Sequence, residues 1–178
     1  DKGASALAAV LKQTRISTLN LYDNAIGDEG ASALAAVLKE TQITTLNVDG
    51  HTLQIDELKG TTPTEKIDLS RKGLGVASAI IIASCIKENG VLKELNLSHN
   101  ELCGVNSWGT GTYTTEGITK LCEGLRGSTV TSLDLASNAL CGVGQFGGGT
   151  YNAEGITKLC EGIKGSAVTS LDLASNAL

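Results

Sequence analysis

Hydrophobic and polar residues alternate in short runs that recur along the chain. The clearest run, TSLDLASNAL, stands at 131–140 and again, unchanged, at 169–178. A period of two is typical of a β-strand. A second motif, EGITKLCEG, stands at 116–124 and 154–162 and has the apolar spacing of an amphipathic helix. Both motifs return after 38 residues (131 to 169), so the pattern predicts stacked strand–helix units.

Each strand run continues into Asn and a further Leu, which gives the pattern LxLxxNxL. The segment ISTLNLYDNAIGDEGASALAAVLKETQ, at 16–42, shows the same order of strand, loop and helix. These motifs resemble the leucine-rich repeat of the ribonuclease-inhibitor type, as found in NOD-like receptors. The resemblance covers essentially the whole chain. It implies an α/β leucine-rich-repeat solenoid, a curved arc with parallel strands on the concave face and helices on the convex face. It also implies that Asn24, Asn100 and Asn138 form a hydrogen-bonded ladder to neighbouring backbone.

We expect a single domain over 1–178 with about six stacked units. Asp1 stands just before a helix and Leu178 ends an LxxNxL motif, so we expect both ends to cut through a repeat and the chain to be a fragment. The unit at 43–63 is irregular. After Leu53 the sequence QIDELKGTTPT is too short for a full helix, which predicts a unit that keeps its strand and loses its convex helix.

Charge and composition exclude several classes of function. The formal charge of −5 and the pI of about 5.0 argue against a nucleic-acid or anionic-membrane surface. No apolar run is long enough for a membrane span. The five cysteines lack CxxC-like spacing and are interpreted as small core residues rather than zinc ligands. His51 has no second metal ligand nearby and is interpreted as an exposed turn residue. With no signal-peptide pattern, we expect an intracellular protein, in the cytoplasm or an organelle.

Two units carry an insertion of 11 residues between strand and helix (38 against 27), at 103–115 and 141–153. Four of the five aromatic residues lie there, at equivalent places: Trp108, Tyr113, Phe146 and Tyr151. Insertions in repeats map to one face, often the binding face, so we expect stacked loops on one rim that bind a partner. The alternative is that the aromatic rings pack together. Packing is favoured for Tyr113 and Tyr151, near the helix starts, and partner contact for Trp108 and Phe146.

Two further surfaces are candidates for binding a partner. The first is a small, polar, mildly acidic row that projects from the strands: Asn20, Asn47, Asp68, Asn96, Asp134 and Asp172, with Tyr22 beside it. Only Tyr22 has the character of an interface hot spot. The second is formed by Ile80 and Ile81, which the helical pattern turns away from the core. They either fill the space left by the missing helix, against 54–62, or form an exposed patch.

These observations predict a non-enzymatic protein-binding module or scaffold, whose partner is another protein or a multi-subunit assembly. The two histidines stand in no recognisable catalytic motif, and GQFGGGT lacks the Lys of a phosphate-binding loop. We therefore expect no cofactor, no metal and no small-molecule substrate. Three alternatives stay open: a structural subunit or spacer in a larger assembly, the sensor part of a receptor-like protein, and a small-GTPase activator.

Overall fold

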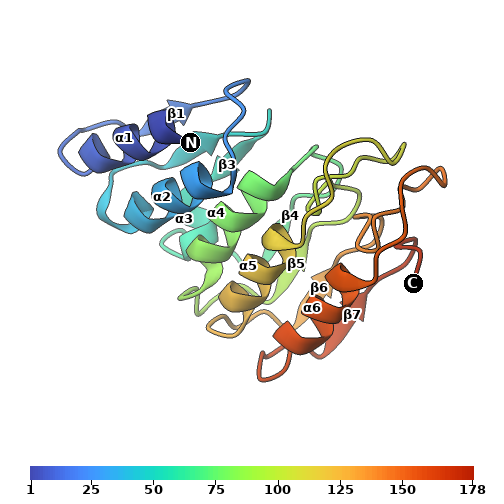
Figure 1. Ribbon diagram of the computed structural model, residues 1–178. Coiled ribbons are helices and arrows are strands. Elements are labelled where there is room, and N and C mark those ends of the chain that lie inside the picture. The colour runs from blue at the N-terminus through green and yellow to red at the C-terminus, as the bar shows by residue number, and fades with distance from the viewer.

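The computed structural model, which describes residues 1–178, is a row of helices packed on a layer of strands (Figure 1). The helices are α1 (Lys2–Leu11), α2 (Asp28–Val37), the short 3-10 helix η1 (Leu38–Glu40), α3 (Ile55–Lys59), α4 (Val76–Ile86), α5 (Glu116–Leu125) and α6 (Glu154–Gly162). The strands are β1 (Thr18–Asn20), β2 (Thr45–Asn47), β3 (Thr52–Gln54), β4 (Lys66–Asp68), β5 (Glu94–Asn96), β6 (Ser132–Asp134) and β7 (Ser170–Asp172). The two termini lie at opposite ends of the row.

The strands form two sheets rather than one. The order in the first is β1-β2-β3, and the order in the second is β4-β5-β6-β7. All pairs in the second sheet are parallel and keep the repeat in register: Leu95 pairs with Leu133, and Leu133 pairs with Leu171. The predicted α/β solenoid of parallel strands and covering helices is therefore present, with one interruption between β3 and β4.

The interruption is made by the irregular unit. β3 turns back on β2 and pairs with it in antiparallel register, Leu46 opposite Leu53. α3 follows and has five residues, with Ile55 and Leu58 buried. The sequence interpretation, in which this unit keeps one strand and has no helix, missed both β3 and this short helix. Since α3 is short, α4 packs directly against α2, and the row of helices continues past the break.

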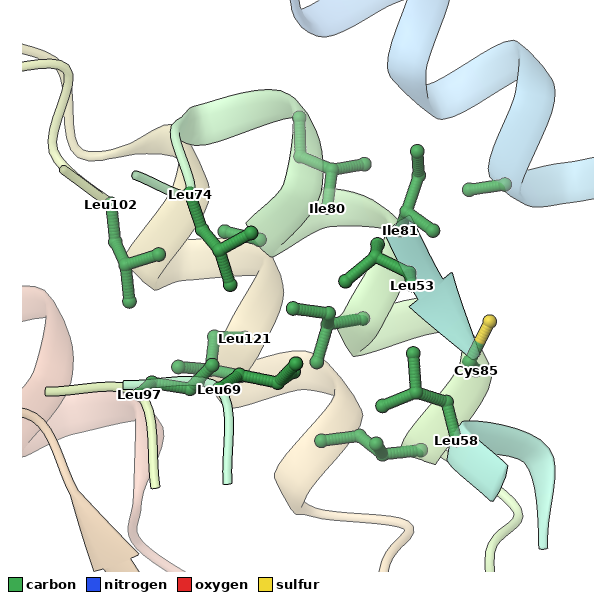
Figure 2. Packing of buried hydrophobic residues seen from close by; sticks show 14 of the residues in the cluster. Leu53, Leu58, Leu69, Leu74, Ile80, Ile81, Cys85, Leu97, Leu102 and Leu121 are labelled. Carbon is green, nitrogen blue, oxygen red and sulfur yellow. The ribbon is translucent and has the colours of Figure 1, made fainter. Parts of the chain in front are cut away.

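Ile80 and Ile81 of α4 are 3% and 0% exposed, so they do not form the exposed patch considered above. Figure 2 shows both side chains in the same buried cluster as Leu53 and Leu58, which come from β3 and α3. α4 packs on α2, α3 and α5, and this surrounds the apolar helix on several sides. The expectation that the two isoleucines bind a partner is therefore wrong, because they belong to the core.

A ladder of asparagine side chains ties neighbouring units together, as the resemblance implied. The Nδ2 of Asn100 donates to the carbonyl of Leu69 in the preceding unit (2.9 Å), and its Oδ1 accepts from the amide of Leu74 (3.0 Å). Asn138 donates in the same way to Leu97 (2.9 Å). Asn24 is the exception, since its Nδ2 reaches only carbonyls of its own turn.

Two helices are capped by an aspartate of the preceding segment. The carboxylate of Asp1 accepts from the amides of Gly27 (2.9 Å) and Gly30 (3.1 Å) at the start of α2. Asp49 accepts from Gly75 and Ser78 at the start of α4, both at 2.9 Å. A carboxylate at a helix N-terminus satisfies free amides and interacts favourably with the helix dipole. Each cap therefore fixes the position of one unit on the next.

Candidate functional site

The first insert is a closed loop with defined backbone hydrogen bonds. An isolated antiparallel bridge joins Val105 to Gly111 at its base. Within the loop, the amide of Asn106 donates to the carbonyl of Thr110 (3.0 Å), and its Oδ1 accepts from the amides of Trp108 (3.0 Å) and Thr110 (3.1 Å). The loop therefore holds Trp108 at its tip on a bonded frame.

The second insert repeats this geometry and lies on the first. Val143 bridges Gly149 at its base, and the amide of Phe146 donates to the carbonyl of Ser107 in the first loop (3.0 Å). The loops approach so closely that a Cβ on Gly109 would lie 1.9 Å from the carbonyl carbon of Gly148. The predicted stacking of the inserts is thus seen, and only glycine permits this approach at residue 109. Figure 1 shows both loops projecting on the same side of the molecule.

The two loop tips place Trp108 and Phe146 in contact with each other. Their ring centroids are 4.5 Å apart, with an angle of 34° between the planes. Trp108 is nevertheless 68% exposed and Phe146 is 62% exposed, so the pair is stacked and also open to solvent. Neither insert contains a charged residue. We call this pair and the loops 103–115 and 141–153 the aromatic ridge.

The two insert tyrosines have different surroundings. Tyr113 is half-buried, and its hydroxyl donates to the carbonyl of Leu140 (2.7 Å) and accepts from the amide of Gly155 (2.9 Å). Burial raises the pKa of Tyr113 to about 12. Tyr113 thus connects the first insert to the start of α6, which agrees with the packing alternative. Tyr151 is 60% exposed and belongs to the accessible part of the ridge.

The polar row on the strands lines a shallow groove of about 380 Å3 over β4, β5 and β6, where Asp68, Asn96 and Asp134 lie side by side. In each of these residues Oδ1 accepts from the backbone amide two positions later, at 2.9 Å. Asp172 does the same with Ala174. The row therefore shapes the turns after the strands and leaves its remaining side-chain atoms for contact.

Backbone hydrogen bonding also sets the ionisation of this row. The hydrogen bond from the Ser70 amide is the largest influence that lowers the pKa of Asp68. Asp68 is therefore ionised at neutral pH. Tyr22, at the end of β1, is 59% exposed, and its ring lies against the Cα of Gly50 at the tip of the next turn. The row and Tyr22 together give the sheet side a polar, weakly acidic surface.

The cysteines give little reactive chemistry. Cys85, Cys103, Cys122 and Cys141 are buried, whereas Cys160 is exposed and departs from the expected core position. Burial raises the pKa of Cys85 and of Cys103 to about 12. Thiols of this kind are protonated near neutral pH and are poor nucleophiles.

The histidines also lie apart from any site of reaction. His51 is partly buried in the turn between β2 and β3, and burial, followed by the charge of Lys72, lowers its pKa. His99 contacts Arg71, with Nη2 and Nε2 at 3.1 Å. No group of three or more His, Cys, Asp or Glu side chains is arranged to hold a metal ion. No helix has the length and apolar character needed to cross a bilayer.

Comparison with known families agrees with this architecture. Residues 14–35 match a family model described as Leucine Rich repeat, and residues 91–111 match a second model described as Leucine Rich Repeat. The first match covers β1 and the loop into α2, and the second covers β5 and part of the first insert. No curated protein matches the chain at the threshold of the search. The fold and the two matches define a leucine-rich-repeat protein, with an α/β leucine-rich-repeat solenoid.

Proposed function

We propose that this chain is a non-enzymatic protein-binding module of the ribonuclease-inhibitor type, which recognises its partner with the aromatic ridge. The observation that carries the proposal is the pair Trp108 and Phe146, which is rigidly held and yet more than half exposed. Leucine-rich-repeat domains in general mediate protein–protein interaction. Large aromatic residues dominate binding energy at such interfaces, particularly when their own loops are already ordered.

The chemistry of the ridge indicates the kind of partner surface. The inserts have no charge and offer two ring faces, Gly backbone and the polar side chains of Asn106, Gln145 and Thr150. A neutral, apolar patch with a few hydrogen-bonding groups on the partner would complement this surface. The polar row from Asp68 to Asp172, with Tyr22, is a second contact surface on the sheet side. Its acidic character favours a weakly basic partner segment.

The test is a pull-down from a lysate of the source cells, with bound proteins identified by mass spectrometry. We expect the double variant Trp108→Ala and Phe146→Ala to lose a specific partner that the wild-type chain retains. Val10→Ala is a matched control, because Val10 is 49% exposed on α1, far along the row from the ridge. Circular dichroism checks that each variant keeps its fold. Equal capture by both variants would contradict recognition through the ridge.

One observation favours a second candidate, a structural subunit fixed in a larger assembly. Leu171 and Leu173 of the last unit are only half-buried, whereas the equivalent Leu133 and Leu135 are 1% and 0% exposed. The outer edge of β7 also pairs with no strand. Cross-linking within the isolated assembly distinguishes the candidates. Cross-links from Lys158 and Lys164, beside this face, would support the structural role, and links confined to the ridge would oppose it.

A further inference from the structure

The break between the two sheets leaves two strand edges facing one groove. β3 ends the first sheet, β4 begins the second, and no strand pairs with both. Thr52 and Gln54 of β3 line one wall of the groove, and Lys66 and Asp68 of β4 line the other. Its volume is about 390 Å3. We call it the edge groove.

The register of each sheet determines which backbone groups point into the edge groove. The amide of Ile55 donates to Thr44 (2.8 Å), so odd-numbered residues of β3 bond to β2. In β4, Leu69 donates to Asn96 (2.8 Å), so odd-numbered residues bond to β5. Hydrogen-bonding groups alternate in direction along a strand. The backbone N–H and C=O groups of the four even-numbered wall residues are therefore left out of both ladders.

The floor of the edge groove is apolar. Leu58, Ile67 and Leu69 line it from α3, β4 and the turn after β4. Ile67 and Leu69 keep 8% and 7% of their surface exposed, more than most residues of the core. A strand placed between the walls would direct every second side chain toward this floor. One apolar side chain of an added strand would thus be buried there.

Charge at the rim of the groove is asymmetric. Lys72 lines the groove, is exposed, and lies within 4 Å of no carboxylate in the chain. Its charge is felt by His51 on the opposite rim, where it is the second cause, after burial, of the lowered pKa. Lys66 does not compete for the same space, because its Nζ is paired with Glu94 on the β5 side at 2.8 Å. The groove therefore offers one uncommitted positive charge.

We infer that the edge groove binds an extended segment of a partner protein, which adds as a strand between β3 and β4 and makes the strand layer continuous. Backbone groups of the four wall residues supply main-chain hydrogen bonds, and the floor receives an apolar side chain. An acidic side chain of the segment pairs with Lys72. Strand addition to a free sheet edge gives affinity through the main chain and specificity through alternate side chains. The inference is independent of the aromatic ridge.

A single pair of variants tests the main-chain contact. Gln54 has φ −85°, which is close to the value that proline requires, and its N–H takes no part in the β2–β3 ladder. Gln54→Pro therefore removes one groove donor and leaves the fold in place. Gln54→Ala keeps the donor and is the matched control. Lys72→Glu reverses the charge at the rim.

The probe is an immobilised array of capped pentapeptides that alternate polar and apolar residues, with Thr, Glu or Lys at polar positions and Val, Ile or Leu at apolar positions. We expect the wild-type chain to select members with Glu. Gln54→Pro weakens binding about tenfold, the effect of one lost main-chain hydrogen bond, and Gln54→Ala leaves it unchanged. Lys72→Glu shifts the selection to members with Lys.

Amide chemical shifts of the wild-type chain locate the selected peptide without any variant. Shifts centred on Thr52, Gln54, Lys66 and Asp68 support the inference. It is overturned if no array member binds at millimolar concentration, if both Gln54 variants bind equally, or if the shifts lie elsewhere. Concentration-dependent shifts at these amides in the absence of peptide would replace the partner segment with a second copy of the chain and would overturn the inference as well.

Discussion

Tyr113 and Tyr151 occupy equivalent positions in the two inserts, yet the structure uses them differently. The hydroxyl of Tyr113 joins Leu140 to Gly155 in the following unit, whereas Tyr151 is 60% exposed. The local sequences around them are similar, GTGTYTTEG and GGGTYNAEG. The difference therefore comes from the neighbouring unit. In a solenoid, each unit supplies half of the environment of the next one.

The helices of the same two units repeat this contrast. Cys122 on α5 is 3% exposed, and its equivalent Cys160 on α6 is exposed. The Cβ and Sγ of Cys122 lie against Gly162 of α6, where an added Cβ would come within 2.3 Å of the Cβ of Cys122. Identical residues thus have different stability and reactivity, and four measurements can sharpen or break this comparison.

The largest effect is expected at alkaline pH. Burial raises the pKa of Cys122 from an ordinary value near 9 to about 11. The unfolded chain loses this proton first, so the stabilisation is complete below pH 9 and is lost as the pH rises toward 11. Two units of pH correspond to about 3 kcal/mol in the free energy of unfolding. We expect Cys122→Ala to flatten the decline of stability above pH 9 in denaturant titrations, and Cys160→Ala to leave it unchanged. Equal slopes for the two variants would break the comparison.

Thiol labelling measures the same contrast as a rate. At pH 8 a thiol with a pKa of about 11 is ionised to roughly one part in a thousand. We expect a maleimide to modify Cys160 in the native protein long before Cys122, and to modify all five cysteines in denaturant. Peptide mapping after timed quenching gives the rates. Comparable rates at both cysteines would show that α6 separates readily from α5.

Removing one hydroxyl tests the contact between the units. Tyr113→Phe leaves the carbonyl of Leu140 and the amide of Gly155 without this partner, and we expect a loss of about 2 kcal/mol in the free energy of unfolding. Tyr151→Phe is the matched control, with an expected change below about 0.5 kcal/mol. Chemical denaturation followed by circular dichroism measures both. Similar losses would mean that Tyr113 is not specially bonded in solution.

The smallest effect concerns the ridge itself. Stacking of Trp108 on Phe146 should contribute about 1 kcal/mol beyond the separate side chains. A double-mutant cycle with Trp108→Ala and Phe146→Ala measures this coupling in the free energy of unfolding. Additive losses would show that the rings do not stay in contact.

The regular part of the fold could be predicted from the sequence because its cause is local. Leu133 and Leu135 alternate with polar residues, Asn138 follows at a fixed distance, and the same spacing recurs after 38 residues. Stacking of the inserts follows from that period alone. The ladder bond from Asn138 to Leu97 was available in the same way, since every unit presents the same groups to the next.

The features that could not be predicted depend on contacts between different units. The cap that Asp49 provides at Gly75 joins residues 26 apart and leaves no local motif. The antiparallel strand β3 arises where the repeat fails, so no period indicates it. Ile81 was placed by alignment with regular units, but α4 has α2 as a direct neighbour and buries this residue completely. Only the geometry of Trp108 and Phe146 shows that rings can stack together and remain exposed.

The break between β3 and β4 also has a mechanical consequence. Helices α2 and α4 are in direct contact across it, while the strand layer has no hydrogen-bonded ladder there. The convex layer therefore carries tension and compression along the solenoid at this point, and the concave layer offers little resistance to bending. Stiffness is lower here than between β4 and β7, where both layers are continuous. The arc accordingly has one compliant joint, and its two segments bend about the helices rather than about the strands.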